Sequence, residues 1–273
     1  MTGTGTVHTE GAAIVYDYVG AGPLLLTIAG GGGDAARYDR MAQLLADAYT
    51  VVSYDRRGNS RSTGDPSVAL DMAQSARDAA AVIRALGAER AYVFGNSGGA
   101  SIGLKLAEDT PDVIAGLVAH EPPISAILPD AARWLAFDRE VDETYRTQGL
   151  GPAMRLFFGA LVGFDAPTPP PGAAGGGPRN IGGGPNMDFF MAREFLPIST
   201  YAPDLEAIAR HRVPIVAAAG RRSADAYYAR TARLLAERLG CRYAEFPGNH
   251  NAFMNDTVAF AASLREALQQ LAP

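Results

Sequence analysis

Cysteine, lysine and long apolar runs are scarce in this chain of 273 residues. Cys241 is its one cysteine, which excludes an internal disulfide and a CxxC metal or redox site. No stretch is apolar and long enough for a membrane span, and the first residues lack the basic and apolar regions of a signal peptide. We therefore expect a cytoplasmic protein without a membrane partner.

Basic residues are outnumbered and spread along the chain. There are 24 Lys and Arg against 29 Asp and Glu, and Lys105 is the one lysine, which suits a GC-rich bacterial genome. No basic run is long enough to follow a phosphate backbone, so nucleic acid is not an expected partner. No cluster of His, Cys and acidic residues has metal-ligand spacing, so we expect neither a metal nor an organic cofactor.

What the chain does contain is an alternation of short apolar runs and longer amphipathic ones. With 48% hydrophobic and 19% charged residues, it can bury a large core. The alternation predicts βα units and an α/β fold with a mainly parallel sheet flanked by helices. The expected strands span 13–19, 24–29, 50–54, 91–95, 115–120, 214–219 and 241–246. The expected helices span 34–48, 67–87, 100–110, 225–240 and 257–271.

The alternation stops between residues 124 and 203. This stretch has helical patterns but no convincing strand, and it contains the Pro- and Gly-rich segment "APTPPPGAAGGGPRNIGGGPN". An insertion of this kind between two strands is typical of a lid over a site. We predict a core of residues 1–123 and 204–273, and a helical cap with a flexible loop at 124–203.

The strongest chemical signal is "GNSGG", a G-x-S-x-G motif between an expected strand and an expected helix. Gly95 and Gly99 permit a sharp turn that holds Ser97 in strained backbone geometry, with its hydroxyl beyond the edge of the sheet. The N–H groups at the start of the following helix then point toward a developing oxyanion. The motif therefore predicts Ser97 as a nucleophile.

The order of several motifs resembles the α/β-hydrolase superfamily, in particular its capped esterase and epoxide-hydrolase-like branch. "LLLTIAGGGG", "YDRRGNSRS", "GNSGG" and "FPGNHNAF" follow one another as in that family, and the resemblance covers nearly the whole chain. It implies that His250, shortly after the last strand, is the general base. His8 in a polar N-terminal tail, His120 at a strand end and His211 near a helix terminus do not match that place.

The glycine run at residues 30–33 has two interpretations. The resemblance implies an oxyanion hole formed by the N–H groups of Gly98 and of Gly31, or alternatively Gly32. The same run fits a dinucleotide-binding G-x-G-x-x-A pattern, with Asp55 as the ribose-binding acid of an NAD(P)-dependent oxidoreductase. That second interpretation leaves "GNSGG" and "PGNH" unexplained.

The acid that would complete a Ser-His-acid triad is left open by the sequence. In the family the acid most often follows the strand that here reads "PIVAAAG", but Ser223 occupies the expected position. Some members place the acid after the strand that follows the nucleophile helix, where this chain has Glu121. We expect Glu121 to be the acid, with Asp225 as the alternative and a dyad assisted by water or Ser223 as a third possibility.

These residues predict a serine hydrolase that acts on an ester, lactone or related acyl compound of largely apolar character. The small-molecule substrate would meet apolar side chains of the insertion, among them Trp134, Phe137, Phe158, Phe190 and Met191. The alternative is a binding protein of the same fold in which catalysis is weak or lost, because the acid is missing at Ser223. The oligomeric state stays open.

Overall fold

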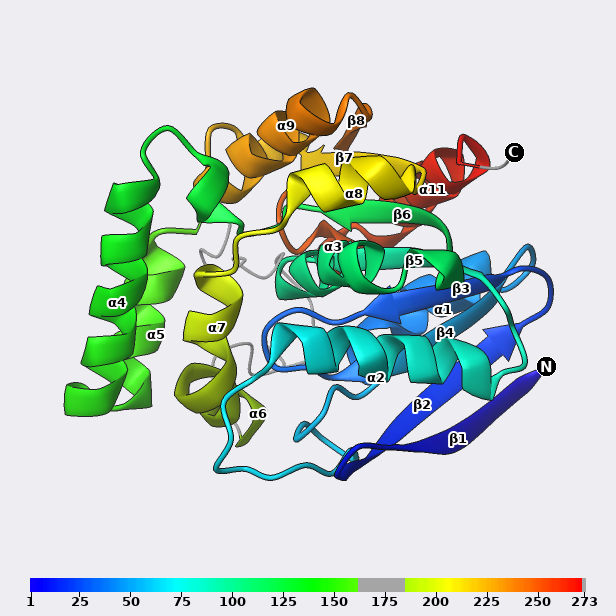
Figure 1. The fold of residues 1–273 in the computed structure, drawn as a ribbon, viewed down its shortest axis with the longest axis horizontal. Helices are drawn as coiled ribbons and strands as arrows, with labels where there is room; N and C mark the ends of the chain where they lie inside the picture. The colour runs from blue at the N-terminus through cyan, green and yellow to red at the C-terminus, as the bar shows by residue number, and fades with distance from the viewer. Residues whose placement is uncertain (162–184, 272–273) are drawn as a thin grey trace, which may run out of the picture.

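An eight-stranded sheet organises the computed structural model, which describes residues 1–161 and 185–271 (Figure 1). Its strands follow the order β1-β2-β4-β3-β5-β6-β7-β8. The pairs β1/β2 and β2/β4 are antiparallel, and all the others are parallel. The strands are β1 Thr2–Thr9, β2 Ala12–Gly20, β3 Leu24–Ile28, β4 Thr50–Tyr54, β5 Ala91–Asn96, β6 Ile114–His120, β7 Ile215–Gly220 and β8 Arg242–Phe246. The predicted α/β architecture is confirmed.

The first strand, β1, is a correction to the sequence prediction, which placed His8 in a polar tail. β1 pairs along its length with β2, and His8 lies opposite Ala13. Its polar sequence TGTGTVHT has no apolar run, because β1 is an edge strand that alternates between exposed and half-buried positions. A Cβ on Gly3 would lie 2.6 Å from the hydroxyl of Tyr18, so the tyrosine covers a strand position that lacks a side chain.

Helices cover both faces of the sheet, as expected for parallel strands that are apolar on both sides. α2, α3 and α8 lie in front of the sheet in Figure 1, whereas α1 and α11 lie behind it. Successive residues such as Leu25 and Leu26 therefore enter different core clusters. The helices of the core are α1 Asp39–Leu45, α2 Met72–Ala85, α3 Gly98–Asp109, α8 Leu205–His211, α9 Tyr227–Leu239, α10 Ala252–Asn255 and α11 Thr257–Gln269.

A further group of helices lies between β6 and α8 in the chain, and we call them the cap helices. They are α4 Ala131–Gln148, α5 Leu150–Gly159, α6 Pro185–Phe189, a π-helical turn at Phe190–Glu194 and α7 Phe195–Ser199. Figure 1 shows them beside the end of the sheet at which the parallel strands finish. The division into a core and a cap stays a prediction, and the predicted flexible loop lies largely in residues 162–184, outside the described residues.

A buried ion pair joins the cap helices to the core. Arg56, which follows β4, donates from Nη1 and Nη2 to the two carboxylate oxygens of Glu194 at 2.8 and 2.7 Å. The side chains of both residues are at most 4% exposed. Asn59 Nδ2 also donates to Glu194, at 2.8 Å, and Arg56 Nη2 donates to the carbonyl of Gly30 at 2.9 Å. Separation of the two side chains would leave a buried charge without its partner, which is unfavourable. The ion pair therefore holds the π-helical turn against the loop that follows β4.

Candidate active site

Ser97 lies at the turn between β5 and α3 in a strained backbone conformation. Its φ of 57° and ψ of −128° are rare for a residue with a side chain. A Cβ on Gly99 would overlap the carbonyl of Ile28, and one on Gly95 would overlap the carbonyl of Gly99. Only glycine at these two positions allows the strand and the helix to approach so closely, which is the local reason for the G-x-S-x-G pattern.

His250 lies in the loop between β8 and α10, with 6% of its surface exposed. Its ring nitrogen Nδ1 is 2.6 Å from Oε2 of Glu121, a distance typical of a strong hydrogen bond to a carboxylate. His250 and Ser97 line the same pocket. The structure therefore brings together the serine, the histidine and one of the two candidate acids.

Glu121 directly follows β6 and is fully buried. Its φ of 50° is unusual for a residue with a Cβ and turns the side chain toward the loop that carries His250. The oxygen that does not contact His250, Oε1, accepts the backbone N–H of Gly220 at 2.8 Å. The alternative acid, Asp225, is not brought to this place: its side chain is 96% exposed and lies 3.8 Å from Arg233.

The surroundings of Glu121 favour its ionised form. Burial acts to raise the pKa of this carboxyl, but the rings of His120 and His250 and the hydroxyl of Ser223 outweigh burial and lower it below its usual value. Ser223, which occupies the position where the family most often has an acid, thus lies buried beside the glutamate. A carboxylate that stays ionised can orient an imidazole and stabilise its protonated form.

Asn96, which the sequence did not point to, and His120, which it placed at a strand end, lie immediately behind this pair. Asn96 precedes Ser97, His120 precedes Glu121, and the two are register partners on β5 and β6. His120 Nδ1 is 2.6 Å from Asn96 Oδ1, and burial lowers the pKa of His120 to about 4. The backbone N–H of Ser97 also donates to the carbonyl of His120 at 2.9 Å. These contacts hold the ends of β5 and β6 in fixed positions relative to each other.

The glycine loop after β3 lies across the pocket from Ser97. Gly31 and Gly98 both line that pocket, whereas Gly32 does not. Gly32 adopts a φ of 84°, and its carbonyl accepts a hydrogen bond from Asn186 at 2.9 Å. Of the two predicted choices for the first oxyanion donor, the structure places Gly31 beside the serine.

The pocket has two adjoining lobes with volumes of about 20 and 50 Å³. Phe158 and Phe190, predicted to meet substrate, line it. The described lining does not include Trp134, Phe137 or Met191. Trp134 stacks on Tyr227 with ring centroids 4.4 Å apart, while Phe137 and Met191 pack among the cap helices. Two further aromatic residues of the insertion, Phe157 and Phe195, also line it, as the sequence allowed. Lining residues that the sequence did not single out are Leu161, Tyr227, Tyr228 and Phe253.

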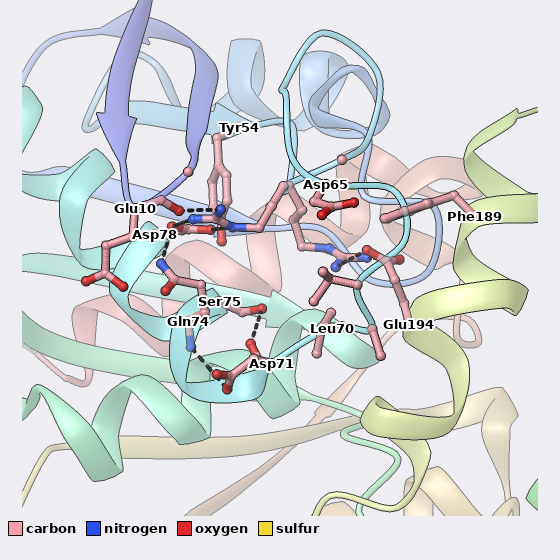
Figure 2. A pocket seen from close by; sticks show the side chains of 16 residues that line it. Glu10, Tyr54, Asp65, Leu70, Asp71, Gln74, Ser75, Asp78, Phe189 and Glu194 are labelled. Atoms are coloured by element: carbon pink, nitrogen blue, oxygen red, sulfur yellow. Dashed lines mark hydrogen bonds and ion pairs between the residues drawn. The ribbon is translucent and has the colours of Figure 1, made fainter.

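A larger cavity, of about 320 Å³, lies elsewhere in the described residues. Figure 2 shows it between the start of α2, with Asp71 just before the helix and Asp78 within it, and the segment that carries Phe189 and Glu194. Neither Ser97 nor His250 lines it, and Asp78 and Glu194 are engaged in ion pairs with arginines. Because Ser97 and His250 line the smaller pocket together, we assign the candidate site to that pocket.

The dinucleotide interpretation requires the carboxylate of Asp55 to be free to bind a ribose, and the structure does not place it so. Asp55 is fully buried, and its carboxylate accepts the N–H of Ala35 at 2.8 Å and Nε of Arg61 at 2.5 Å. The acid is therefore used inside the "YDRRGNSRS" turn. Within residues 1–161 and 185–271, no group of three or more His, Cys, Asp or Glu could hold a metal, and no helix is long and apolar enough to cross a membrane.

Comparison with known proteins adds to this geometry. A family model described as "alpha/beta hydrolase fold" matches residues 23–163. An uncharacterized hydrolase of Bacillus subtilis (strain 168), YraK, is 31% identical over 273 residues, covering 97% of this chain and 96% of YraK. A thermophilic esterase from Thermogutta terrifontis (malate bound) is 19% identical, with a TM-score of 0.75 and 100% of both chains covered. The enol-lactonase from Burkholderia xenovorans LB400 is 18% identical, with a TM-score of 0.71, covering 97% of this chain and 100% of that one.

Proposed function

Because this chain belongs to the α/β-hydrolase fold family, we propose that it is a serine hydrolase that cleaves esters or lactones through an acyl-enzyme. The observation that carries the proposal is the 2.6 Å contact between His250 Nδ1 and Glu121, made beside a strained Ser97 in one pocket. The names of two structural neighbours, an esterase and an enol-lactonase, agree with this reaction class.

In the proposed mechanism His250 keeps its proton on Nδ1 and donates a hydrogen bond from there to the carboxylate of Glu121. This tautomer makes Nε2 the basic ring nitrogen, which takes the proton of Ser97 as the serine oxygen attacks the acyl carbon. The N–H groups of Gly31 and Gly98 hold the negative oxygen of the tetrahedral intermediate. The protonated ring then gives its proton to the departing alcohol.

The second half of the reaction uses the same groups. His250 removes a proton from water, the hydroxide attacks the acyl carbon, and the protonated ring returns its proton to Ser97 as the acid product leaves. Glu121 stays ionised throughout because its pKa is lowered, so it stabilises each imidazolium that forms. A lactone follows the same course, except that the departing alcohol remains part of the product.

The alternative of a binding protein without catalysis depended on the missing acid at Ser223. Glu121 weighs against that alternative, because its buried carboxylate lies within hydrogen-bond distance of His250 despite the serine at position 223. No described feature now favours a binding protein over an enzyme.

Hydrolysis of short and medium p-nitrophenyl esters tests the proposal. We expect turnover by the wild type and a loss of at least about 10³-fold in Ser97→Ala. Ser67→Ala, at an exposed serine outside the pocket, is the matched control and should retain full activity. An organophosphonate should add to Ser97, as seen by mass spectrometry. Equal rates in wild type and Ser97→Ala would reject the mechanism.

A further inference from the structure

Arg37 introduces a positive charge into the wall of the catalytic pocket. We propose that the natural substrate is an ester or lactone that also carries a carboxylate, which the Arg37 guanidinium binds while the acyl carbon faces Ser97. This inference rests on the function proposed above and narrows it to a substrate class. It also replaces the largely apolar substrate that the sequence predicted.

The fold holds Arg37 close to the proposed oxyanion donor. Arg37 lies in the 3-10 turn Ala35–Tyr38 that follows the glycine loop, and its Nη1 donates to the carbonyl of Gly31 at 2.7 Å. The ring of Phe253 lies to one side, with its centroid 5.8 Å from the guanidinium carbon. Two independent contacts thus orient the guanidinium group.

Arg37 differs in charge from the other described residues that line this pocket. Of the described residues that line either lobe, Arg37 is the one Lys, Arg, Asp or Glu. Asp34 attracts it from a longer distance, but the Asp34 carboxylate caps the turn by accepting the N–H of Ala36 at 2.9 Å. In contrast, both arginines at the larger cavity, Arg56 and Arg57, form ion pairs with carboxylates.

The charge and the burial of Arg37 together favour the binding of an anionic group. Burial lowers the pKa of Arg37, yet a guanidinium remains protonated in proteins, so the group is partly desolvated while still charged. Its fork of five N–H donors matches the two oxygens of a carboxylate. A carboxylate on the substrate would supply the partner charge that the described pocket lining lacks.

The position of Arg37 also limits the length of such a substrate. Nη1 contacts the carbonyl oxygen of the residue whose N–H is proposed to hold the oxyanion, which places the two donors within about 6 Å of each other. The substrate carboxylate and the reacting carbonyl are therefore separated by a short chain of a few carbons. Half-esters of short dicarboxylic acids have this form.

A pair of matched substrates provides the test. Monoethyl glutarate and ethyl pentanoate differ by a carboxylate in place of a terminal methyl group, and released ethanol reports on both. We expect the wild type to favour monoethyl glutarate by at least about 10-fold in kcat/KM, and Arg37→Gln to lose this ratio. Arg37→Lys, which keeps the charge, should retain part of the preference. Arg40→Gln, at an exposed arginine outside the pocket, is the matched control and should keep the wild-type ratio.

A binding measurement separates failure of this inference from failure of the proposed function. Glutarate should bind to Ser97→Ala in calorimetry, and at least about 10-fold more weakly to the double variant that also carries Arg37→Gln. This readout needs no turnover, so it holds even if neither ethyl ester is cleaved. Equal preference ratios in wild type and Arg37→Gln, or equal glutarate affinities, would overturn the role of Arg37. Turnover that persists in Ser97→Ala would instead reject the proposed function.

Discussion

Asp138 on α4 offers a sharp test of how the cap helices are packed. Its side chain is 2% exposed, and it forms no ion pair with another described residue. Burial raises the pKa of this carboxyl to about 7. Asp138→Asn keeps the shape of the side chain and removes the possibility of charge, so it isolates the cost of ionising this group inside the protein.

The sign and size of the effect follow from proton linkage. Below pH 4 the carboxyl is protonated in both the folded and the unfolded chain, so ionisation contributes nothing. Between pH 4 and 7 the unfolded chain loses the proton while the folded protein keeps it, so stability falls as pH rises. A difference of about 3 pKa units corresponds to about 4 kcal/mol, of which about 3 kcal/mol falls between pH 5 and 8.

Urea denaturation followed by circular dichroism at pH 5 and pH 8 measures this directly. We expect Asp138→Asn to gain about 3 kcal/mol relative to the wild type between the two pH values, because the amide does not ionise. In thermal unfolding the same gain corresponds to about 6 °C, at roughly 2 °C per kcal/mol for a chain of this length.

The control is Asp225→Asn, which changes an almost fully exposed carboxylate. It should shift stability little, and by the same amount at both pH values. If Asp138→Asn likewise differed from the wild type by the same amount at pH 5 and pH 8, the carboxyl would not be titrating in a buried place, and the described packing of α4 would be refuted.

Three more outcomes follow from the described contacts. Glu121→Gln should lower kcat for esters by about 10³- to 10⁴-fold, while Asp225→Asn should stay near the wild type; the reverse order in steady-state kinetics would identify Asp225 as the acid. Glu194→Gln, which leaves Arg56 as a buried charge without its partner, should cost about 3–5 kcal/mol in urea denaturation, and an unchanged midpoint would contradict the buried pair. Gly99→Ala should abolish ester turnover because its Cβ overlaps the carbonyl of Ile28, and an active variant would show that the turn is looser than described.

Much of the fold was accessible from the sequence because parallel strands buried on both faces form continuous apolar runs. Each of the seven expected strands corresponds to a strand from β2 to β8. β1 was missed because this edge strand carries no apolar run: Val7 is its one large apolar residue, and Tyr16 and Tyr18 from the neighbouring strand cover its glycines.

The candidate site could be predicted from the sequence only where its residues stand in a local sequence motif. Ser97 and His250 stand in recognisable motifs, and Glu121 was reached because a serine occupies position 223. The sequence placed His120 at a strand end, but its contact with Asn96 was not predictable because it spans two strands that are adjacent only in the folded sheet. Arg37 gave no signal either, since the role proposed for it depends on which way the turn after the glycine loop directs a long side chain.

Arg56 connects the glycine loop beside the candidate site to a segment that is distant in the sequence. One guanidinium holds both the carbonyl of Gly30, next to the proposed oxyanion donor, and Glu194 in the π-helical turn. The glycine loop and the cap helices are therefore mechanically coupled, and neither can shift far without breaking bonds that anchor the other. Displacement of the π-helical turn would therefore release the same guanidinium group that donates to the carbonyl of Gly30 in the glycine loop.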